Sequence, residues 1–142
     1  MCLPDENEHE TYGYADMIYQ ASCHCGAVQA QVEAPEIIEC DDCNCSICAK
    51  SGYLHLIVPK SRFQLSQGAQ VLTSYRFNTQ VATHYFCKVR GVKVYYIPRS
   101  NPDDIDANVR SLSPAPKQLI IRAFDGKNWE ANAASLTHLS QE

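Results

Sequence analysis

The cysteines limit most strongly what this chain can be. Eight occur among 142 residues, and six of them fall in two tight groups, at residues 23–25 and 40–48. This share, about 6%, lies below the roughly 8–10% typical of small secreted disulfide scaffolds. The N-terminal stretch is acidic and lacks an apolar core, so we expect no secretory signal. In a reducing compartment cysteines more often bind metal or do redox work than form bridges, so we expect a cytoplasmic metal protein.

Length and charge narrow the class of protein further. A chain of 142 residues is enough for one domain, and its 45% hydrophobic and 20% charged residues are ordinary for a globular fold. The net charge of −4 argues against a nucleic-acid surface built on positive charge. No apolar run approaches the roughly 18 residues of a membrane-spanning helix. We expect neither a nucleic acid nor a membrane as partner, and the sequence leaves the oligomeric state open.

Short β-type runs separated by Gly, Pro, Asn and Asp dominate the chain. They are residues 26–33, 36–40, 53–58, 63–65, 72–77, 81–87, 92–98, 105–112 and 119–124. This spacing predicts an all-β domain of mainly antiparallel short strands, spanning residues 19–142. Helical turns are expected only at residues 46–50 and 128–139. The first eighteen residues are acidic and aperiodic, which predicts a flexible or peripheral tail.

The run Cys43, Cys45, Cys48 is the strongest metal signal. A Cys-x-Cys step on extended chain puts both sulfurs on one face, and a Cys-x-x-Cys turn brings two sulfurs onto one ion. Zinc takes thiolates in a tetrahedral array. Three protein ligands leave a fourth position for water or substrate, which is typical of catalytic rather than structural zinc. We therefore predict that these three cysteines form a catalytic zinc site.

Two alternatives stay open for this run. If Cys40, three residues before Cys43, completes the tetrahedron, the site is closed and only structural. The cysteines can also form disulfides, which a reducing compartment disfavours. The second group, Cys23 and Cys25, needs partners from elsewhere, and Cys87 is the other candidate, although spacing alone does not establish that pairing.

Several motifs resemble the glutathione-dependent formaldehyde-activating enzyme family, which also includes centromere protein V. The matching segments are residues 22–27 (SCHCGA), 43–48 (CNCSIC), 72–77 (LTSYRF), 86–87 (FC), 91–92 (GV), 96–102 (YIPRSNP), 108–110 (NVR) and 124–129 (FDGKNW). The resemblance extends over about residues 19–131. It implies a tent-like, mainly antiparallel β fold stapled by zinc, with one structural and one catalytic site.

Carried over to this chain, the resemblance assigns the catalytic zinc to Cys43, Cys45 and Cys48. It assigns the structural zinc to Cys23, Cys25, Cys87 and position 90. That position holds Arg90, and a guanidinium has only donors and stays protonated, so it cannot ligate zinc. We expect this structural site to be weakened or vacant, because the energy of a structural zinc is folding energy. His24 and Cys2 are candidates to supply the missing ligand.

The family reaction joins formaldehyde and glutathione to give S-hydroxymethylglutathione, and its reverse cleaves a carbon–sulfur bond. We therefore expect a zinc-dependent carbon–sulfur lyase with glutathione, a small thiol, as its partner. Three cations are candidates to balance the thiolate charge: Lys50, Arg76 and Arg99. The guanidinium of Arg99 can also bind a glutathione carboxylate, although a solvated surface charge is the simpler interpretation of each of the three.

The remaining polar candidates have plain structural explanations as well. His55 can be an acid, a base or an extra ligand, but a half-buried strand histidine is the simpler interpretation, as it is for His84. Ser46 fits a hydrogen bond to a cysteine sulfur better than the role of nucleophile. Two other functions are compatible with the sequence: a non-catalytic zinc-stabilised binding module similar to centromere protein V, and a redox role for Cys23 and Cys25.

Overall fold

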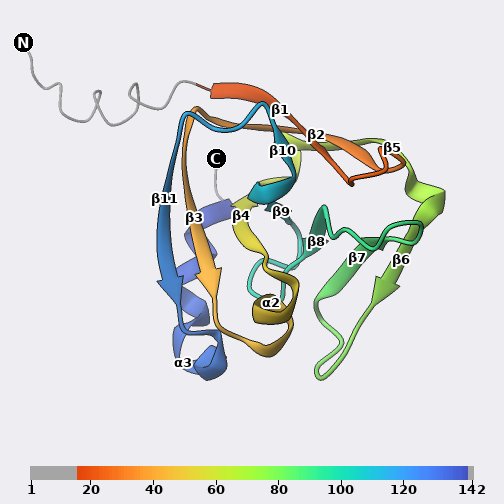
Figure 1. Ribbon diagram of the computed structural model, residues 1–142. Helices are drawn as coiled ribbons and strands as arrows, with labels where there is room; N and C mark the ends of the chain where they lie inside the picture. Colours follow the sequence, from red (N-terminus) through yellow and green to blue (C-terminus); the bar gives the residue numbers. More distant parts are fainter. Residues whose placement is uncertain (1–15, 141–142) are drawn as a thin grey trace, which may run out of the picture.

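The computed structural model describes residues 16–140 as two β-sheets with short helical segments (Figure 1). The strands are β1 (Asp16–Ser22), β2 (Gln29–Pro35), β3 (Ile37–Cys43), β4 (Leu54–Val58), β5 (Phe63–Gln67), β6 (Leu72–Tyr75), β7 (Thr83–Cys87), β8 (Tyr95–Ile97), β9 (Ile105–Asn108), β10 (Leu112–Ser113) and β11 (Gln118–Phe124). The α-helices are α2 (Ser46–Ser51) and α3 (Trp129–Asn132). Short 3-10 turns are η1 (Lys60–Arg62), η2 (Ala69–Val71), η3 (Val109–Ser111), η4 (Gly126–Asn128) and η5 (Ala133–Ser140).

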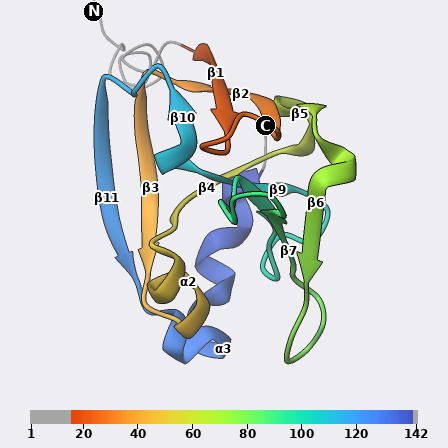
Figure 2. The same cartoon turned by 45° about the vertical axis from the view of Figure 1, so that its right-hand side comes forward.

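The strands form a four-stranded sheet in the order β10-β1-β2-β5 and a seven-stranded sheet in the order β11-β3-β4-β9-β8-β7-β6. In Figures 1 and 2 the smaller sheet crosses the top of the molecule, and α2 and α3 lie below, near the ends of β3 and β11. Neighbouring strands are antiparallel except β3 and β11, which run parallel. The prediction of an all-β, mainly antiparallel fold is confirmed.

Strand β4 is buried along its whole length because both faces of the larger sheet are covered at this strand. Leu54, Leu56 and Val58 point into the hydrophobic core, whereas His55 and Ile57 line a pocket on the opposite face. This alternation follows from the two-residue period of a strand. The apolar run of β4 therefore builds the core on one face and presents one histidine to a cavity on the other.

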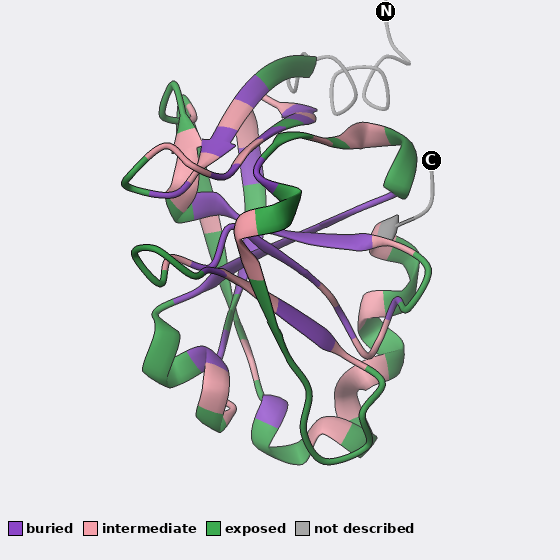
Figure 3. Ribbon diagram, turned by 90° about the vertical axis from the view of Figure 1, so that its right-hand side faces the viewer, coloured by how far each residue is buried: buried purple, intermediate pink, exposed green. Residues whose placement is uncertain are grey.

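The same alternation lines up pocket residues across four strands. Ile57 of β4 is paired with Asp106 of β9, Asp106 with Tyr96 of β8, and Tyr96 with His84 of β7. Their neighbours along the strands face the core instead, where the buried strand interiors appear in Figure 3. The sheet thus places a row of polar and aromatic side chains along one wall.

Element bounds differ from the predictions in a few places. The run at residues 105–112 is interrupted because the Asn108 side chain accepts a hydrogen bond from the backbone of Arg110 and starts the turn η3 between β9 and β10. The helical stretch predicted at residues 128–139 consists of α3 followed by the 3-10 turn η5. Of the predicted tail, residues 1–15 lie outside the described part of the chain, and residues 16–18 begin β1. Within the described residues, no helix is long and apolar enough to span a membrane.

Candidate functional site

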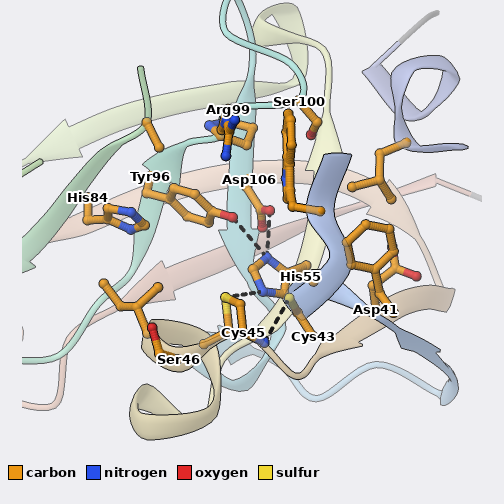
Figure 4. A pocket seen from close by; sticks show the side chains of 18 of the residues that line it. Asp41, Cys43, Cys45, Ser46, His55, His84, Tyr96, Arg99, Ser100 and Asp106 are labelled. Atoms are coloured by element: carbon orange, nitrogen blue, oxygen red, sulfur yellow. Dashed lines mark hydrogen bonds and ion pairs between the residues drawn. The ribbon is translucent and has the colours of Figure 1, made fainter. Parts of the chain in front are cut away.

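A pocket of about 570 Å³ opens on the face of the larger sheet away from the core. Its walls come from β3, β4, β7, β8 and β9, and its floor from the start of α2 (Figure 4). The loop after β11 and the helix α3 complete it. All three cysteines of the run at residues 43–48 line this pocket, together with both histidines that the sequence singled out, His55 and His84.

The chain delivers the three sulfurs through a strand end followed by a helix start. Cys43 is the last residue of β3, Cys45 is the extended residue that precedes α2, and Cys48 is the buried residue of α2. Asn44 joins the loop after β3 to the loop after β11. Its side chain donates to the Asp125 carboxylate (3.0 Å) and accepts from the backbone of Lys127 (2.9 Å).

The position after Asp125, residue 126, has room only for a glycine. A Cβ at position 126 would collide with Sγ of Cys43 and press on Cβ of Cys45. The backbone of Gly126 therefore packs directly against the cysteine run, and any side chain there would displace Cys43.

His55 adds a nitrogen donor to the sulfurs. Its Nε2 atom lies 3.1 Å from Sγ of Cys48, and its Nδ1 atom lies 2.7 Å from Oδ2 of Asp106. The donor atoms of Cys43, Cys48 and His55 all lie within 4.8 Å of one another, and all three residues are buried. Cys45, which is partly exposed, stands at the edge of this group, its backbone N–H donating to Sγ of Cys43 (3.5 Å).

The pKa values of the three thiols are shifted in different directions. Hydrogen bonds from Cys43 and Cys48 lower the pKa of Cys45 to about 2. Hydrogen bonding has the opposite effect on the two partners, because the bond with Cys45 raises the pKa of Cys43, and the bonds with Cys43 and Cys45 raise the pKa of Cys48. Of the three thiols, the partly exposed Cys45 is therefore the one whose pKa is lowered.

Buried polar groups surround His55. Asp106 is 1% exposed, and its second oxygen has no partner among the described residues. The hydroxyl of Tyr96 lies 3.2 Å from Nδ1 of His55, and the hydroxyl of Tyr53 donates to the backbone carbonyl of Asp106 (2.5 Å). Burial raises the pKa of Tyr53 and of Tyr96 well above the ordinary value, so both hydroxyls keep their protons. The imidazole is held in one orientation from its Nδ1 side.

A buried lysine supplies positive charge behind the pocket wall. Lys93 is 4% exposed, and its ammonium lies 2.7 Å from Nδ1 of His84 and over the ring of Tyr96 (3.9 Å). Burial lowers the pKa of Lys93 to about 8, while the nearby sulfurs and Asp106 work against that shift. Burial, and then Lys93, lowers the pKa of His84 to about 4, so its ring is neutral at pH 7.

Arg99 stands in the wall of the pocket with its charge already paired. Its guanidinium donates to the carboxylate of Glu130 (2.7 Å) and stacks on the ring of Trp129 (3.7 Å). Glu130 is 84% exposed, so this ion pair lies at the surface. The other two cations considered from the sequence, Lys50 and Arg76, are exposed and do not line the pocket.

Cys40 does not join the cluster. A three-residue step along β3 puts Cys40 and Cys43 on opposite faces, and Cys40 lies in the hydrophobic core. Burial raises the pKa of Cys40, which keeps it a thiol. The closed alternative with Cys40 as fourth ligand is therefore not what the structure forms. Every cysteine of the described residues is a free thiol. Ser46 lines the pocket but, within the described chain, its hydroxyl bonds no cysteine sulfur.

The second cysteine group also assembles, near the smaller sheet. Sγ of Cys25 lies 3.2 Å from that of Cys23 and 3.6 Å from that of Cys87. Although burial opposes it, hydrogen bonds from the backbone of Val28 and from the neighbouring thiols lower the pKa of Cys23 to about 7. Arg90 is exposed and bonds the backbone of Val89 (3.3 Å), so it contributes no donor to the group.

Of the two candidates for a replacement ligand, only His24 belongs to the described residues. His24 is exposed and belongs to neither of the two donor groups that the described residues form. Cys2 lies outside the described residues. In the described chain the second group therefore consists of three sulfurs, one of them, Cys25, exposed to solvent.

Fold and pocket together define a class of β proteins with cysteine–histidine clusters able to hold a metal ion. The model of the glutathione-dependent formaldehyde-activating enzyme family matches residues 18–119. The chain belongs to this family. Its fold is similar to that of a Rhodobacter sphaeroides protein of known crystal structure, with 33% sequence identity and a TM-score of 0.61, over 67% of this chain and 88% of that one.

Nothing in the sequence pattern indicated that Asp106 and Lys93 would be buried beside the pocket. Asp106 lies in a strand segment where a carboxylate usually faces solvent, and Lys93 lies in an apolar strand run. Their burial becomes visible only once β9 and β8 are placed beside β4. The sequence did present His55, but as an ambiguous strand histidine.

Proposed function

We propose that this protein is a zinc-dependent carbon–sulfur lyase that forms or cleaves a hydroxymethyl adduct of glutathione or a similar small thiol. The observation that carries the proposal is the convergence of three cysteine sulfurs on one pocket with Arg99 in its wall. The family supports glutathione-related formaldehyde activation. We place the activity in the reducing cytoplasm, where glutathione is abundant and free thiols persist.

The donors fit zinc. Thiolate and imidazole are the ligands that zinc prefers, and the sulfurs of Cys43, Cys45 and Cys48 reach one end of the pocket. The close approach of Gly126 fixes Cys43 where a metal site needs a rigid ligand. When bound, zinc supplies Lewis acidity and favours the thiolate form of a coordinated thiol. We propose that these three cysteines hold it and leave one position for the substrate.

The reaction balances without a redox partner. In the forward direction the thiolate sulfur attacks the carbonyl carbon of formaldehyde, the carbon–oxygen π electrons move to oxygen, and that oxygen takes up a proton. In the reverse direction the hydroxyl loses its proton, the carbon–sulfur bond breaks, and the thiolate leaves. Thiolates are nucleophiles whereas thiols are not, so the site must keep the substrate sulfur deprotonated.

The chain's own residues then bind and orient the thiol. Arg99 can exchange Glu130 for a carboxylate of the substrate, because the ion pair lies at the surface and is weak. The aromatic side chains of Phe77 and Trp129 line the pocket beside Arg99 and offer an apolar surface to the substrate. The buried ammonium of Lys93 keeps positive charge near the thiolates.

We propose that the Cys23, Cys25, Cys87 group holds zinc weakly or not at all, because Arg90 stands where the family has a fourth cysteine. A three-thiolate site that has lost its fourth ligand has lost part of its folding energy. The domain then relies on the core between its two sheets.

The test is turnover of the adduct by the zinc-loaded protein. Formaldehyde and glutathione also combine without a catalyst, so the assay must be run in the cleavage and formation directions against the uncatalysed rate. We expect acceleration that Cys45→Ser abolishes in a folded protein. A rate equal to the uncatalysed one, with zinc bound, would instead favour a non-catalytic module.

A further inference from the structure

We infer that His55, oriented by Asp106, is a metal ligand of the pocket alongside Cys43 and Cys48. This inference rests on the zinc binding that the proposed function requires, and it changes which side chains hold the ion. The three-cysteine motif omits His55, which stands ten residues beyond Cys45 on a different element, strand β4.

The orientation of the ring carries the first step. Nδ1 of His55 lies 2.7 Å from a carboxylate oxygen of Asp106, so Nδ1 carries the proton and Nε2 presents its lone pair. This is the arrangement in which metal-bound histidines are usually held by a carboxylate. Nε2 then points at Sγ of Cys48, 3.1 Å away.

The chemistry between these two atoms carries the second step. A lone pair and a sulfur at 3.1 Å repel each other unless a cation lies between or beside them, and that cation is a proton or a metal ion. Two donors on one tetrahedral zinc lie about 3.5 Å apart, given bonds of about 2.3 Å to sulfur and about 2.0 Å to nitrogen. Cys43 closes the same group within 4.8 Å, so a metal ion satisfies three buried donors at once.

Charge carries the third step. Three thiolates around Zn²⁺ give a net charge of −1, and a substrate thiolate would make it −2. Two thiolates and a neutral imidazole give zero, and the incoming thiolate makes it only −1. The buried carboxylate of Asp106, 1% exposed, also needs a positive partner, which a metal-bound imidazole provides.

Cys45 then has a different place from its two neighbours. It is the partly exposed member of the run, while Cys43, Cys48 and His55 are all buried. In this arrangement the three buried donors hold the ion, and the substrate sulfur binds on the side of the ion that faces Cys45.

The experiment uses the Cys25→Ser chain, in which the second cysteine group is broken, loaded with one equivalent of Co²⁺ or Zn²⁺. His55→Ala should weaken metal affinity more than Asp106→Asn, which should lower the affinity roughly 10–100-fold because it removes the carboxylate that orients the histidine ring. The matched control is His84→Gln, a buried histidine of the same pocket that belongs to neither donor group. Affinity is measured by chelator competition, and the cobalt spectrum reports the ligands.

We expect the cobalt spectrum to shift in His55→Ala and to stay unchanged in His84→Gln. Equal affinity and an identical spectrum in the two variants would overturn the assignment. If His55→Ala does not fold, X-ray absorption of the zinc-loaded Cys25→Ser chain decides, since it should contain nitrogen at about 2.0 Å beside sulfur at about 2.3 Å. A sulfur-only shell would overturn it. These readouts do not depend on turnover, so an inactive protein with His55 on the metal would refute the proposed function alone.

Discussion

The two donor groups of this molecule have similar compositions and very different surroundings. Cys43, Cys48 and His55 are all buried beside a pocket, whereas the Cys23, Cys25, Cys87 group lies away from that pocket and has Cys25 exposed. The pocket group has a carboxylate behind its histidine and a buried ammonium nearby; the outer group has hydrogen bonds from backbone and neighbouring thiols. The number of donors alone therefore does not distinguish the two groups, whereas the residues that surround the donors do.

The largest effect should come from removing a sulfur of the pocket group. Cys48→Ser takes away a buried donor and leaves His55 without its sulfur neighbour. Turnover should therefore fall by more than the roughly 100-fold that losing a hydrogen-bond partner of a metal ligand costs. Steady-state rates with the S-hydroxymethyl adduct measure it. Cys25→Ser, the matched change in the outer group, should leave the rate nearly unchanged. Equal losses in both variants would erase the distinction between the groups.

The outer group can be made complete. Arg90→Cys places a thiol at the end of the turn that the Gly91 N–H to Cys87 carbonyl bond closes (2.6 Å), and so adds a fourth sulfur. We expect zinc-dependent stabilisation of about 3–4 kcal/mol when free zinc is 100–1,000 times the dissociation constant. Thermal unfolding with and without zinc measures it. Arg90→Ser removes the guanidinium without adding a donor and should show no such gain; a gain in both would point to charge removal instead.

The histidines of the two regions should respond differently to acid. The pKa of His84 is lowered to about 4, so between pH 6.5 and 4 the unfolded chain binds a proton that the folded chain does not. The free energy of unfolding therefore falls as pH falls through this window, by an amount on the order of 2–3 kcal/mol.

Denaturant unfolding across that range measures the effect. His84→Gln should flatten the decline, while His24→Gln, which changes an exposed histidine beside the outer cysteines, should not. A decline of the same size in wild type and His84→Gln would show that other groups cause it.

The smallest effect concerns the pocket wall. Arg99→Ala should raise KM for the glutathione adduct roughly tenfold, the value of one charge-assisted hydrogen bond, and change kcat little. Glu130→Gln should lower KM, because it weakens the competing partner of Arg99. Arg62→Ala, a change to an ion pair with Asp16, serves as the control. A KM unaffected by Arg99→Ala would remove this residue from substrate binding.

Much of this architecture could be predicted from local pattern. Alternation and turn residues located most strands, because side-chain period and Gly or Pro breaks are local properties. The cysteine steps predicted that Cys43, Cys45 and Cys48 would converge, and the structure brings all three to one pocket. Family motifs supplied the pairing of Cys87 with Cys23 and Cys25, which spacing could not establish.

The rest depended on tertiary placement. The exclusion of Cys40 from the site follows from strand phase, and β3 had been expected to end at that residue rather than at Cys43. His55 could not be distinguished from a core histidine until Asp106, fifty-one residues away, was placed beside it. Lys93 belongs to an apolar run and gave no hint that it would be buried against aromatic rings.

Metal content per chain tests the central claim most directly. Native mass spectrometry of the zinc-saturated protein after desalting should find one tightly held ion per chain, still present in Cys25→Ser and absent in Cys48→Ser. A chain that holds no zinc, or one whose zinc disappears in Cys25→Ser and persists in Cys48→Ser, would contradict the account.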